Sequence, residues 1–221
     1  MQRSVGPSHR PVAPSRIAMK LYDAGRAPNS RRTRMFLAEK GISVPLVTVD
    51  LMALDQKSES FLQKNPRGRV PVLEFDDGTF LTESIAICRY FEDIQPEPPL
   101  FGTGARGKAV VEMWQRRAEL ELLNAVAAVF RHTRRSMAAM EVPQVPAWAE
   151  ANKPRVMAFL AFLDEHLRDN TFICGTDFTV ADITAFVAVS LMDWAQLTVP
   201  PTHEHLLRWH AAVQSRPSAS A

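Results

Sequence analysis

The sequence has few cysteines and no long apolar run. Its only two cysteines, Cys88 and Cys174, are far apart and in no Cys-x-x-Cys spacing, so they form neither a disulfide framework nor a zinc motif. None of the six histidines has metal-ligand partners at a suitable spacing, and no stretch approaches the ~20 apolar residues of a membrane-spanning helix. These absences predict a protein of the reducing cytoplasm that holds no metal and crosses no membrane.

An excess of charge is also lacking. The chain has 26 Lys and Arg against 24 Asp and Glu, a formal net charge of +2. This balance gives no general reason to expect nucleic acid or a membrane surface as a partner. The sequence does contain one basic cluster, formed by Arg131, His132, Arg134 and Arg135. We interpret it as a solvated helix end, where cations are favoured, with an anion-binding surface as the alternative.

Proline-rich stretches divide the chain. Residues 1–18 are rich in Pro, Ser and Arg and contain no apolar run of signal-peptide length, so we expect a disordered extension before a fold that begins at Met19. Residues 95–105 begin with a second such stretch, which predicts a stiff, non-helical linker. A hydrophobic content of 46% is enough for a core on each side of this linker. The predicted domains are therefore residues 19–94 and 106–221.

The first domain shows the pattern of alternating strands and helices. In order, the sequence predicts a strand from Met19, a helix from Pro28 that ends before Gly41, a strand within residues 44–51, a short helix near Phe61, a β-hairpin over residues 72–81 and a helix from Ser84. This order, βαβαββα, implies an α/β domain whose first two strands are parallel. In the hairpin, we expect Asp77-Gly78 to supply the positive φ values of a tight turn.

Two features of the hairpin indicate a ligand. Pro71 has no N–H to donate, which places it at the start of a strand or in a special bend, such as one with a cis peptide bond. Thr82, Glu83 and Ser84 lie where the second strand ends and the next helix begins, so backbone N–H groups, a hydroxyl and a carboxylate collect there. This corner suits a ligand that carries both a carboxylate and an ammonium group.

The second domain is predicted to be entirely helical. The apolar pattern predicts helices over residues 106–140, 146–167, 183–194 and 206–213. Thr179 and Asp182 form a capping box before the third of these, with Phe178 and Ile183 placed as its hydrophobic staple. We interpret this motif as a folding signal for a buried helix, with no catalytic role.

These features together resemble the cytosolic glutathione S-transferase superfamily, without separating its bacterial, phi-like, theta-like and beta-like branches. The resemblance covers about residues 19–215, and it implies a thioredoxin-like N-terminal domain followed by an all-α helical bundle. Val70-Pro71 resembles the family's cis-proline site, where the residue before the proline offers its backbone to the cysteinyl part of glutathione. Glu83 and Ser84 resemble the pair that binds the γ-glutamyl carboxylate and ammonium.

The resemblance implies further glutathione contacts. Gln56 and Lys57 align with residues that meet the glycyl carboxylate, and their alternative role is that of an ordinary solvated loop. Arg69 falls where many members have Gln, so it is a further candidate contact.

The electrophile pocket is expected between the first loop and the long helix. Its candidate lining residues are Trp114, Arg117, Leu120 and Glu121. Helical spacing assigns some of these four to the core, and the sequence does not choose among them.

The residue that activates the thiol of glutathione departs from the family pattern. The thiolate is the nucleophile, and an ordinary thiol has a pKa near ~8.5, so the protein has to favour the anion. The position that resembles the catalytic Ser of the phi-like and theta-like branches holds Ala27. The replacements, in order of preference, are Asn29, Ser30 and Tyr22. The alternative roles are helix capping for Asn29 and Ser30, and packing at a strand end for Tyr22.

The implied function is that of a glutathione S-transferase. Its co-substrate is glutathione, its other partner is a small-molecule electrophile, and the family leads us to expect a homodimer. Two alternatives stay open: a glutathione-dependent disulfide reductase in which two glutathiones share the site, and a non-catalytic interaction module with the same fold. The Glu83-Ser84 pair favours ligand binding over the second alternative.

Overall fold

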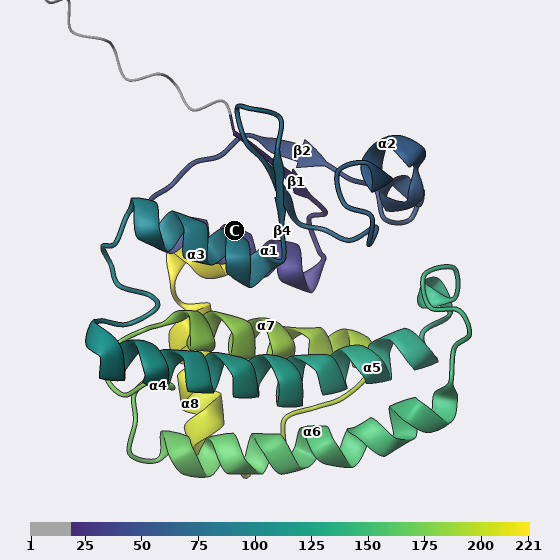
Figure 1. Ribbon diagram of the computed structural model, residues 1–221. Helices are drawn as coiled ribbons and strands as arrows, with labels where there is room; N and C mark the ends of the chain where they lie inside the picture. The colour runs from purple at the N-terminus through teal and green to yellow at the C-terminus, as the bar shows by residue number, and fades with distance from the viewer. Residues whose placement is uncertain (1–18) are drawn as a thin grey trace, which may run out of the picture.

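The computed structural model describes residues 19–221. The extension predicted for residues 1–18 lies outside the described residues. The chain forms two layers, with a small sheet and its helices above a longer helical bundle (Figure 1). No helix in residues 19–221 is long and apolar enough to cross a membrane.

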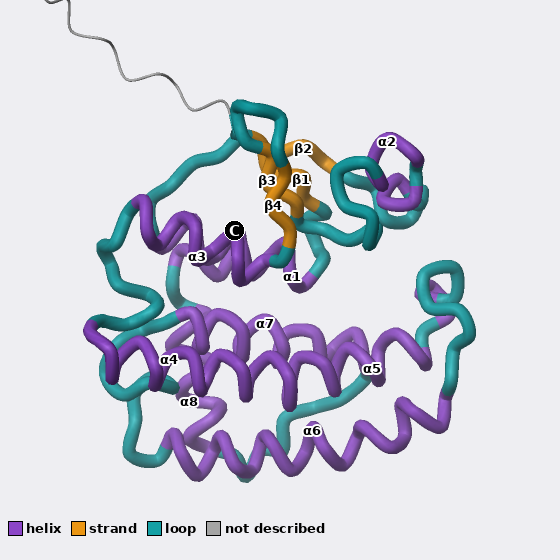
Figure 2. The backbone as a smooth tube through the Cα atoms, in the orientation of Figure 1, coloured by secondary structure: helices purple, strands orange, loops and turns teal. Residues whose placement is uncertain are grey.

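The first domain is built on a four-stranded mixed sheet. Its elements are β1 (Lys20–Asp23), α1 (Pro28–Glu39), β2 (Leu46–Thr48), the 3-10 turn η1 (Asp55–Lys57), α2 (Glu59–Leu62), β3 (Val72–Glu74), β4 (Phe80–Thr82) and α3 (Ser84–Ile94). The strand order is β2-β1-β3-β4, with β1 parallel to β2, and with β3 antiparallel to both β1 and β4. Figure 2 shows these strands as one small sheet above α1 and α3. The observed order of elements is the predicted βαβαββα.

The turn of the β3–β4 hairpin differs from the prediction. Only Gly78 has a positive φ, of 80°, and Asp77 does not. Asp77 acts through its side chain instead: its Oδ1 accepts hydrogen bonds from the backbone N of Thr79 at 2.9 Å and from its hydroxyl at 2.6 Å. The turn is therefore wider than a two-residue turn, and it closes with the backbone N of Phe75 donating to the carbonyl of Thr79 at 2.9 Å.

The second domain is entirely helical. Its elements are α4 (Gly104–Arg117), the π-helical segment η2 (Ala118–Leu123), α5 (Asn124–Thr133), the 3-10 turn η3 (Arg135–Met137), α6 (Pro146–Leu167), α7 (Val180–Ala195), α8 (Glu204–Gln214) and the 3-10 turn η4 (Pro217–Ser220). Helix α7 is buried along most of its length, as a central helix of the bundle must be. It packs against α1 of the first domain as well as against α4 and α5.

The predicted helix over residues 106–140 is shorter than expected and interrupted. It runs as α4, η2 and α5, and it ends at Thr133. Arg134 is extended, with φ −87° and ψ 124°, and its Nε donates to the carbonyl of Trp194 at 2.5 Å. No Pro or Gly marks this end in the sequence. The helix stops where a long-range contact holds the backbone extended, and local residue preferences cannot predict such a contact.

The connection between the two domains is tied to the first one. Lys40 is buried, and its ammonium group lies 2.5 Å from a carboxylate oxygen of Glu92. The same group donates to the carbonyls of Gln95 at 2.9 Å and Pro96 at 3.1 Å, and also to that of Pro98. One cation therefore gathers several carbonyls that would otherwise lack partners.

The C-terminal segment packs back on α1, and the chain ends close to this helix (Figure 1). Arg216 makes a two-pronged contact with Glu39, at 2.8 and 2.7 Å. The Nη2 of Arg31 donates to the carbonyl of Ala219 at 2.8 Å. Helix α1 is thus fixed from both domains, which matters because the cavity described below begins at its N-terminus.

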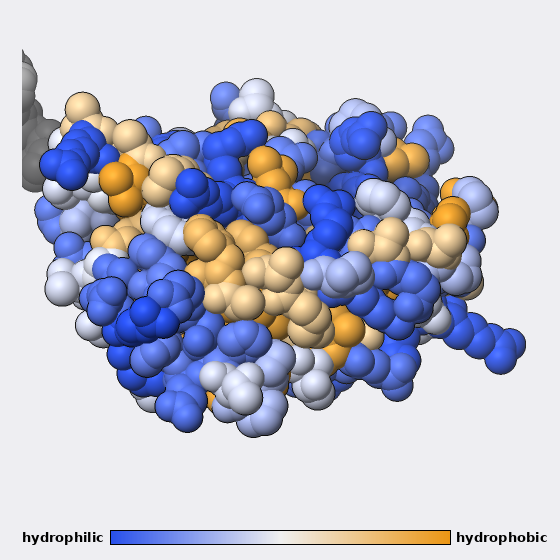
Figure 3. Space-filling model, turned by 90° about the horizontal axis from the view of Figure 1, so that it is seen from below, coloured by the Kyte–Doolittle hydropathy of each residue, from blue (hydrophilic) through white to orange (hydrophobic). Residues whose placement is uncertain are grey.

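Helix α6 exposes apolar side chains on its outer side. Seen from below, the molecule carries a band of apolar residues between hydrophilic margins (Figure 3). Trp148 and Phe162 of this helix are 48% and 46% exposed. The helix also buries Val156, Leu160 and Leu163, so it is apolar on two sides and lacks a fully polar outer face.

The capping box should be a main source of stability. Asp182 is fully buried, and its carboxylate accepts hydrogen bonds from the backbone N of Ile173 at 2.8 Å, the indole N–H of Trp209 at 2.9 Å, and the backbone N and hydroxyl of Thr179 at 2.9 and 3.0 Å. Asp182→Ala leaves these buried donors unpaired and should lower the free energy of unfolding by about 2–4 kcal/mol. Denaturant unfolding measures this loss.

The matched control is Asp177→Ala, which removes an exposed aspartate five residues earlier. It should change the unfolding free energy by less than about 0.5 kcal/mol. Equal effects of the two substitutions would contradict the role given to Asp182.

Candidate functional site

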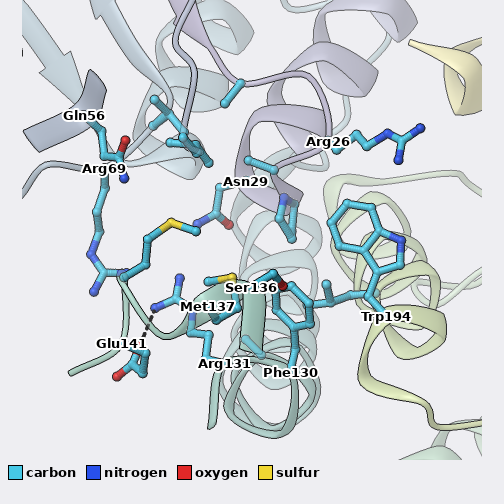
Figure 4. Close-up of a pocket in the computed structure, with 18 of the residues that line it drawn as sticks. Arg26, Asn29, Gln56, Arg69, Phe130, Arg131, Ser136, Met137, Glu141 and Trp194 are labelled. Carbon is cyan, nitrogen blue, oxygen red and sulfur yellow. Dashed lines mark ion pairs between the residues drawn. The ribbon is translucent and has the colours of Figure 1, made fainter. Parts of the chain in front are cut away.

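A cavity of about 1350 Å3 lies between the two domains. The first domain supplies one wall, from the β1–α1 loop, the loop after β2, the segment before β3, and Glu83. The second domain supplies the facing wall, from η2, α5, the segment that follows α5, and the end of α7. Figure 4 shows side chains from both walls pointing toward one another.

The structure brings most of the predicted glutathione-binding residues to this cavity. Those that line it are Asn29, Gln56, Lys57, Arg69, Val70 and Glu83. Pro71 follows Val70 in the chain and Ser84 follows Glu83, and both of these residues are buried. The Val70-Pro71 peptide bond is cis, and β3 begins only at Val72, so Val70 lies before the regular ladder of the sheet.

Gln56 is held at the edge of the cavity by a close backbone contact. Its side chain is buried, and its Oε1 has no hydrogen-bond partner in residues 19–221. Gly68 lies beside it with φ 58°, and a Cβ there would come within 2.8 Å of the Gln56 carbonyl oxygen. Glycine is therefore required at this position, both for the left-handed backbone and for the space. A buried polar atom without a partner is unusual, and it marks Gln56 as a candidate contact for a ligand.

The start of α3 is an unusual corner of the backbone. Glu83 has φ 68° and ψ 113°, a conformation that non-glycine residues seldom adopt. It turns the chain from β4 into α3, and the Glu83 side chain stays exposed at the cavity. Ser84, the first residue of α3, is buried and accepts hydrogen bonds from Arg32. Strain at such a residue is typical of binding sites.

Arg32 connects the corner at Ser84 with the start of α1. Its side chain is 2% exposed, and its Nη2 donates to Ser84 Oγ at 2.6 Å, to Asn29 Oδ1 at 3.2 Å and to Glu119 Oε1 at 2.8 Å. Its Nη1 also lies 3.4 Å from the hydroxyl of Thr184. The partners come from α1, α3, η2 and α7, so one buried cation joins both domains behind the cavity.

The chemistry of arginine fixes how two of these partners are oriented. A guanidinium group only donates hydrogen bonds, so Asn29 has to present its amide oxygen to Arg32 and its amide NH2 elsewhere. Asn29 lines the cavity, and its NH2 group is therefore available there. By the same reasoning Ser84 accepts from Arg32 and keeps its own hydroxyl proton to donate. Arg32 is not among the residues that the sequence predicts for the site; its one signal is a position three residues after Asn29 on the same helix.

The N-terminus of α1 has no side chain of its own to cap it. Ala27 is the N-cap residue, Pro28 opens the helix, and the first turn contains no acidic residue. The partial positive charge at this helix end is therefore not neutralised locally and favours an anion. Ser30 does not reach the cavity: it is fully buried, and its Oγ accepts a hydrogen bond from the backbone N of Ala24 at 3.2 Å.

Tyr22 points away from the cavity. Its hydroxyl donates to Glu74 Oε2 at 2.6 Å, and the ring packs edge-on against Phe61. Burial, together with the hydrogen bond to Glu74 and the charge of that carboxylate, raises the pKa of Tyr22 to about 12. The structure gives Tyr22 a packing role at the strand, which is the alternative that the sequence left open.

Three of the four expected electrophile-pocket residues lie elsewhere. Trp114 is 5% exposed and stacks on Phe162, with ring centroids 5.5 Å apart. Arg117 lies over the Trp114 ring, and Glu121 is exposed outside the cavity. Only Leu120 of the expected set lines it.

The outer lining comes instead from further along the chain, and it has a substantial apolar part. It includes Leu123, Ala127, Phe130, Met137, Met140, Leu191 and Trp194. The π-helical segment η2 is wider than an α-helical turn, so it changes which side chains face the cavity beyond it. A regular helical period could not have revealed that change.

Comparisons with known proteins agree with this geometry. Residues 27–94 match the family described as the glutathione S-transferase N-terminal domain, and residues 146–212 match the C-terminal domain of the same name. Glutathione S-transferase 2 of Saccharomyces cerevisiae is 35% identical over 203 residues, which cover 90% of this chain and 87% of that protein. GstA of Escherichia coli O157:H7 is 33% identical over 171 residues, 75% of this chain and 77% of that protein.

Solved structures extend the likeness to three dimensions. A glutathione S-transferase domain-containing protein of Marinobacter aquaeolei VT8 has a TM-score of 0.87 and 40% identity, over 90% of this chain and 98% of its own. Gtt2 of Saccharomyces cerevisiae has a TM-score of 0.86 and 35% identity, and the match covers 90% of this chain and 97% of that one. The chain belongs to the glutathione S-transferase superfamily, with a thioredoxin-like N-terminal domain and an all-helical C-terminal domain. Its activity is that of a glutathione transferase.

The position of Tyr22 gives a direct test. Tyr22→Phe removes only the hydroxyl that donates to Glu74, so kcat/KM for glutathione conjugation should change less than about twofold, and its pH profile should not move. Steady-state kinetics between pH 6 and 9 measure both. A clear rise in the apparent pKa of the reaction would assign the thiol to Tyr22 after all.

Proposed function

We propose that glutathione binds along the first domain, with its three residues spread over the cavity wall. The γ-glutamyl end is bound at the Glu83-Ser84 corner, where the Glu83 carboxylate lines the cavity and can pair with the ligand ammonium. Ser84 is buried next to Glu83 and is not part of the lining, so its hydroxyl is assigned to the ligand carboxylate on the family resemblance. The cysteinyl part pairs with the backbone of Val70. The glycyl carboxylate meets Lys57, beside the buried amide of Gln56. Support comes from Glu83, Val70, Lys57 and Gln56, which all line one cavity.

The thiolate is stabilised by the Asn29 amide at the N-terminus of α1. The observation that carries this assignment is the hydrogen bond from Arg32 to Asn29 Oδ1, which leaves the amide NH2 free for the sulfur. The uncapped helix end adds a favourable partial charge. Ser30 lacks access and Tyr22 faces elsewhere, so Asn29 is preferred over both.

The reaction is a nucleophilic transfer to carbon. The thiol of glutathione loses its proton to solvent, and the thiolate sulfur uses a lone pair to form a C–S bond with the electrophile. With an aryl halide, the electrons of the broken carbon–halogen bond leave with halide, so charge and atoms balance without an oxidant or reductant. The protein contributes by stabilising the thiolate and by positioning both reactants.

Asn29→Ala tests the assignment. Without the amide donor, the pKa of the bound thiol should rise, and kcat/KM with an aryl halide should fall roughly tenfold at pH 6.5, where the thiolate is the minor form. The loss should shrink as the pH rises, because the thiol then ionises without help. The thiolate absorbance of bound glutathione, titrated in the ultraviolet, measures the pKa directly.

The matched variant is Asn29→Asp, which keeps the shape and the contact to Arg32 but places a carboxylate near the sulfur. It should raise the thiol pKa at least as much as alanine does. An unchanged thiolate titration in both variants would remove Asn29 from this role.

A disulfide reductase is the second candidate function. Ala27 replaces the family's catalytic hydroxyl, and neither cysteine lines the cavity. Burial raises the pKa of Cys88 to about 12 and that of Cys174 to about 11, so neither is a ready nucleophile. Disulfide reduction would therefore need two glutathiones, one attacking the substrate disulfide and one releasing the mixed disulfide as oxidised glutathione.

A non-catalytic interaction module is the third candidate. Elongation factor 1-gamma 2 of Oryza sativa is 30% identical over 167 residues, which cover 76% of this chain but only 38% of that protein. Retention on immobilised glutathione, followed by parallel assays with an aryl halide and a disulfide substrate, separates the three. Turnover of the disulfide alone would favour the reductase, and no retention would favour the interaction module.

We also propose a cytoplasmic homodimer, on the family resemblance and on the small number of cysteines. Light scattering of the purified protein should give about twice the chain mass of 24.7 kDa. A monomeric mass at micromolar concentration would contradict this expectation.

A further inference from the structure

Two arginines lie on opposite walls of the outer cavity. Arg69 belongs to the segment before β3, and Arg131 lies near the C-terminal end of α5. Figure 4 shows both side chains extending into the space between the domains, with Arg131 beside Glu141. Three members of the basic cluster seen in the sequence, Arg131, His132 and Arg134, therefore line the cavity from the helical domain.

The positive charge of this pair is only partly compensated. Within residues 19–221, the Arg69 guanidinium is in no ion pair with a carboxylate, and Glu141 is the only one paired with Arg131. Arg131 Nη1 is 3.7 Å from Glu141 Oε2, and His132 Nε2 is 3.8 Å from the other oxygen of the same carboxylate. Both distances are longer than a hydrogen bond, so Glu141 is shared and held loosely.

The two guanidinium groups are close enough to affect each other. Burial lowers the pKa of Arg131, and the positive charge of Arg69 acts in the same direction. Two like charges facing one another across a cavity repel, and an anion placed between them relieves that repulsion. Arginine suits a carboxylate in particular, because its planar fork can donate two parallel hydrogen bonds.

We propose that Arg69 and Arg131 bind a carboxylate carried by the electrophilic acceptor. This inference rests on the proposed function, because it assigns the carboxylates of glutathione to other partners in the same cavity. The γ-glutamyl carboxylate goes to Ser84, and the glycyl carboxylate to Lys57. An anion at the arginine pair then has to come from the second substrate.

The rest of the outer lining defines the body of that substrate. Phe130, Met137 and Met140 lie on the same wall as Arg131, and Trp194 adds an aromatic ring from α7 (Figure 4). Such a surface suits an aromatic or aliphatic group. The substrate class is therefore an apolar electrophile with an acidic end, oriented so that its reactive carbon faces Asn29 and its carboxylate faces the arginines.

Binding of two product-like ligands tests this without requiring turnover. S-benzylglutathione and S-(4-carboxybenzyl)glutathione differ only in the carboxylate, and calorimetry gives the Kd of each. Arg131→Gln should weaken the carboxylated ligand roughly tenfold and leave S-benzylglutathione within about twofold, since one charge-assisted contact is lost. Arg69→Gln should act in the same direction. Raising the salt concentration should reduce the preference of the unmodified protein for the carboxylated ligand.

The control is Arg135→Gln, which removes the same charge from an exposed residue outside the cavity lining. Both ligands should bind this variant as they bind the unmodified protein. Equal weakening of both ligands by Arg131→Gln would show that the arginines contact glutathione itself, and would overturn this inference alone. Equal binding of both ligands to the unmodified protein would also overturn it. Failure of either ligand to bind at all would overturn the proposed function and this inference with it.

Discussion

The buried guanidinium of Arg32 is the interaction on which the cavity depends. A charge taken out of water is costly unless it is paired and hydrogen-bonded, and here it has a carboxylate at 2.8 Å and several neutral acceptors. These partners belong to both domains, so the requirement to satisfy one cation also fixes how the two walls face each other. Because Arg32 donates to Asn29 Oδ1 and to Ser84 Oγ, the amide NH2 of Asn29 and the hydroxyl proton of Ser84 are left for other partners.

The two domains contribute differently to the site. The first supplies backbone and polar groups at turns that local chemistry fixes, such as Gly68 beside Gln56 and the bend at Glu83. The second supplies a mixture of apolar and polar side chains, with charged residues from η2, from α5 and the segment after it, and from α7. The proposed contacts to glutathione thus come from the first domain, whereas the helical domain lines the outer part of the cavity.

A structural feature can be predicted from the sequence when the residues that form it are neighbours in the chain. The hairpin, the corner at Ser84 and the capping box at Asp182 are each formed by neighbouring residues, so the sequence alone predicts them. Arg32 was not, because nothing near it in the sequence shows that its partners converge from three other elements. The expected pocket lining differs from the observed one for a related reason. Trp114 and Arg117 precede the π-helical segment, whereas the cavity is lined by residues within and beyond it, where the segment has rotated the helix by an amount that no apolar period reports. Tyr22 was ambiguous until its partner on the next strand, Glu74, was seen.

The placement of the two cysteines has a consequence for how the protein would fare in oxidative stress. Cys88 lies on the buried face of α3, and Cys174 lies beside Thr179 of the capping box before α7; neither lines the cavity. Oxidation and mixed-disulfide formation require an accessible thiolate, and burial keeps both side chains in the thiol form. The protein therefore uses the reactive thiol of glutathione but has no reactive thiol of its own. A shift of the cellular glutathione pool toward its disulfide should deplete the co-substrate and leave the protein chemically unchanged.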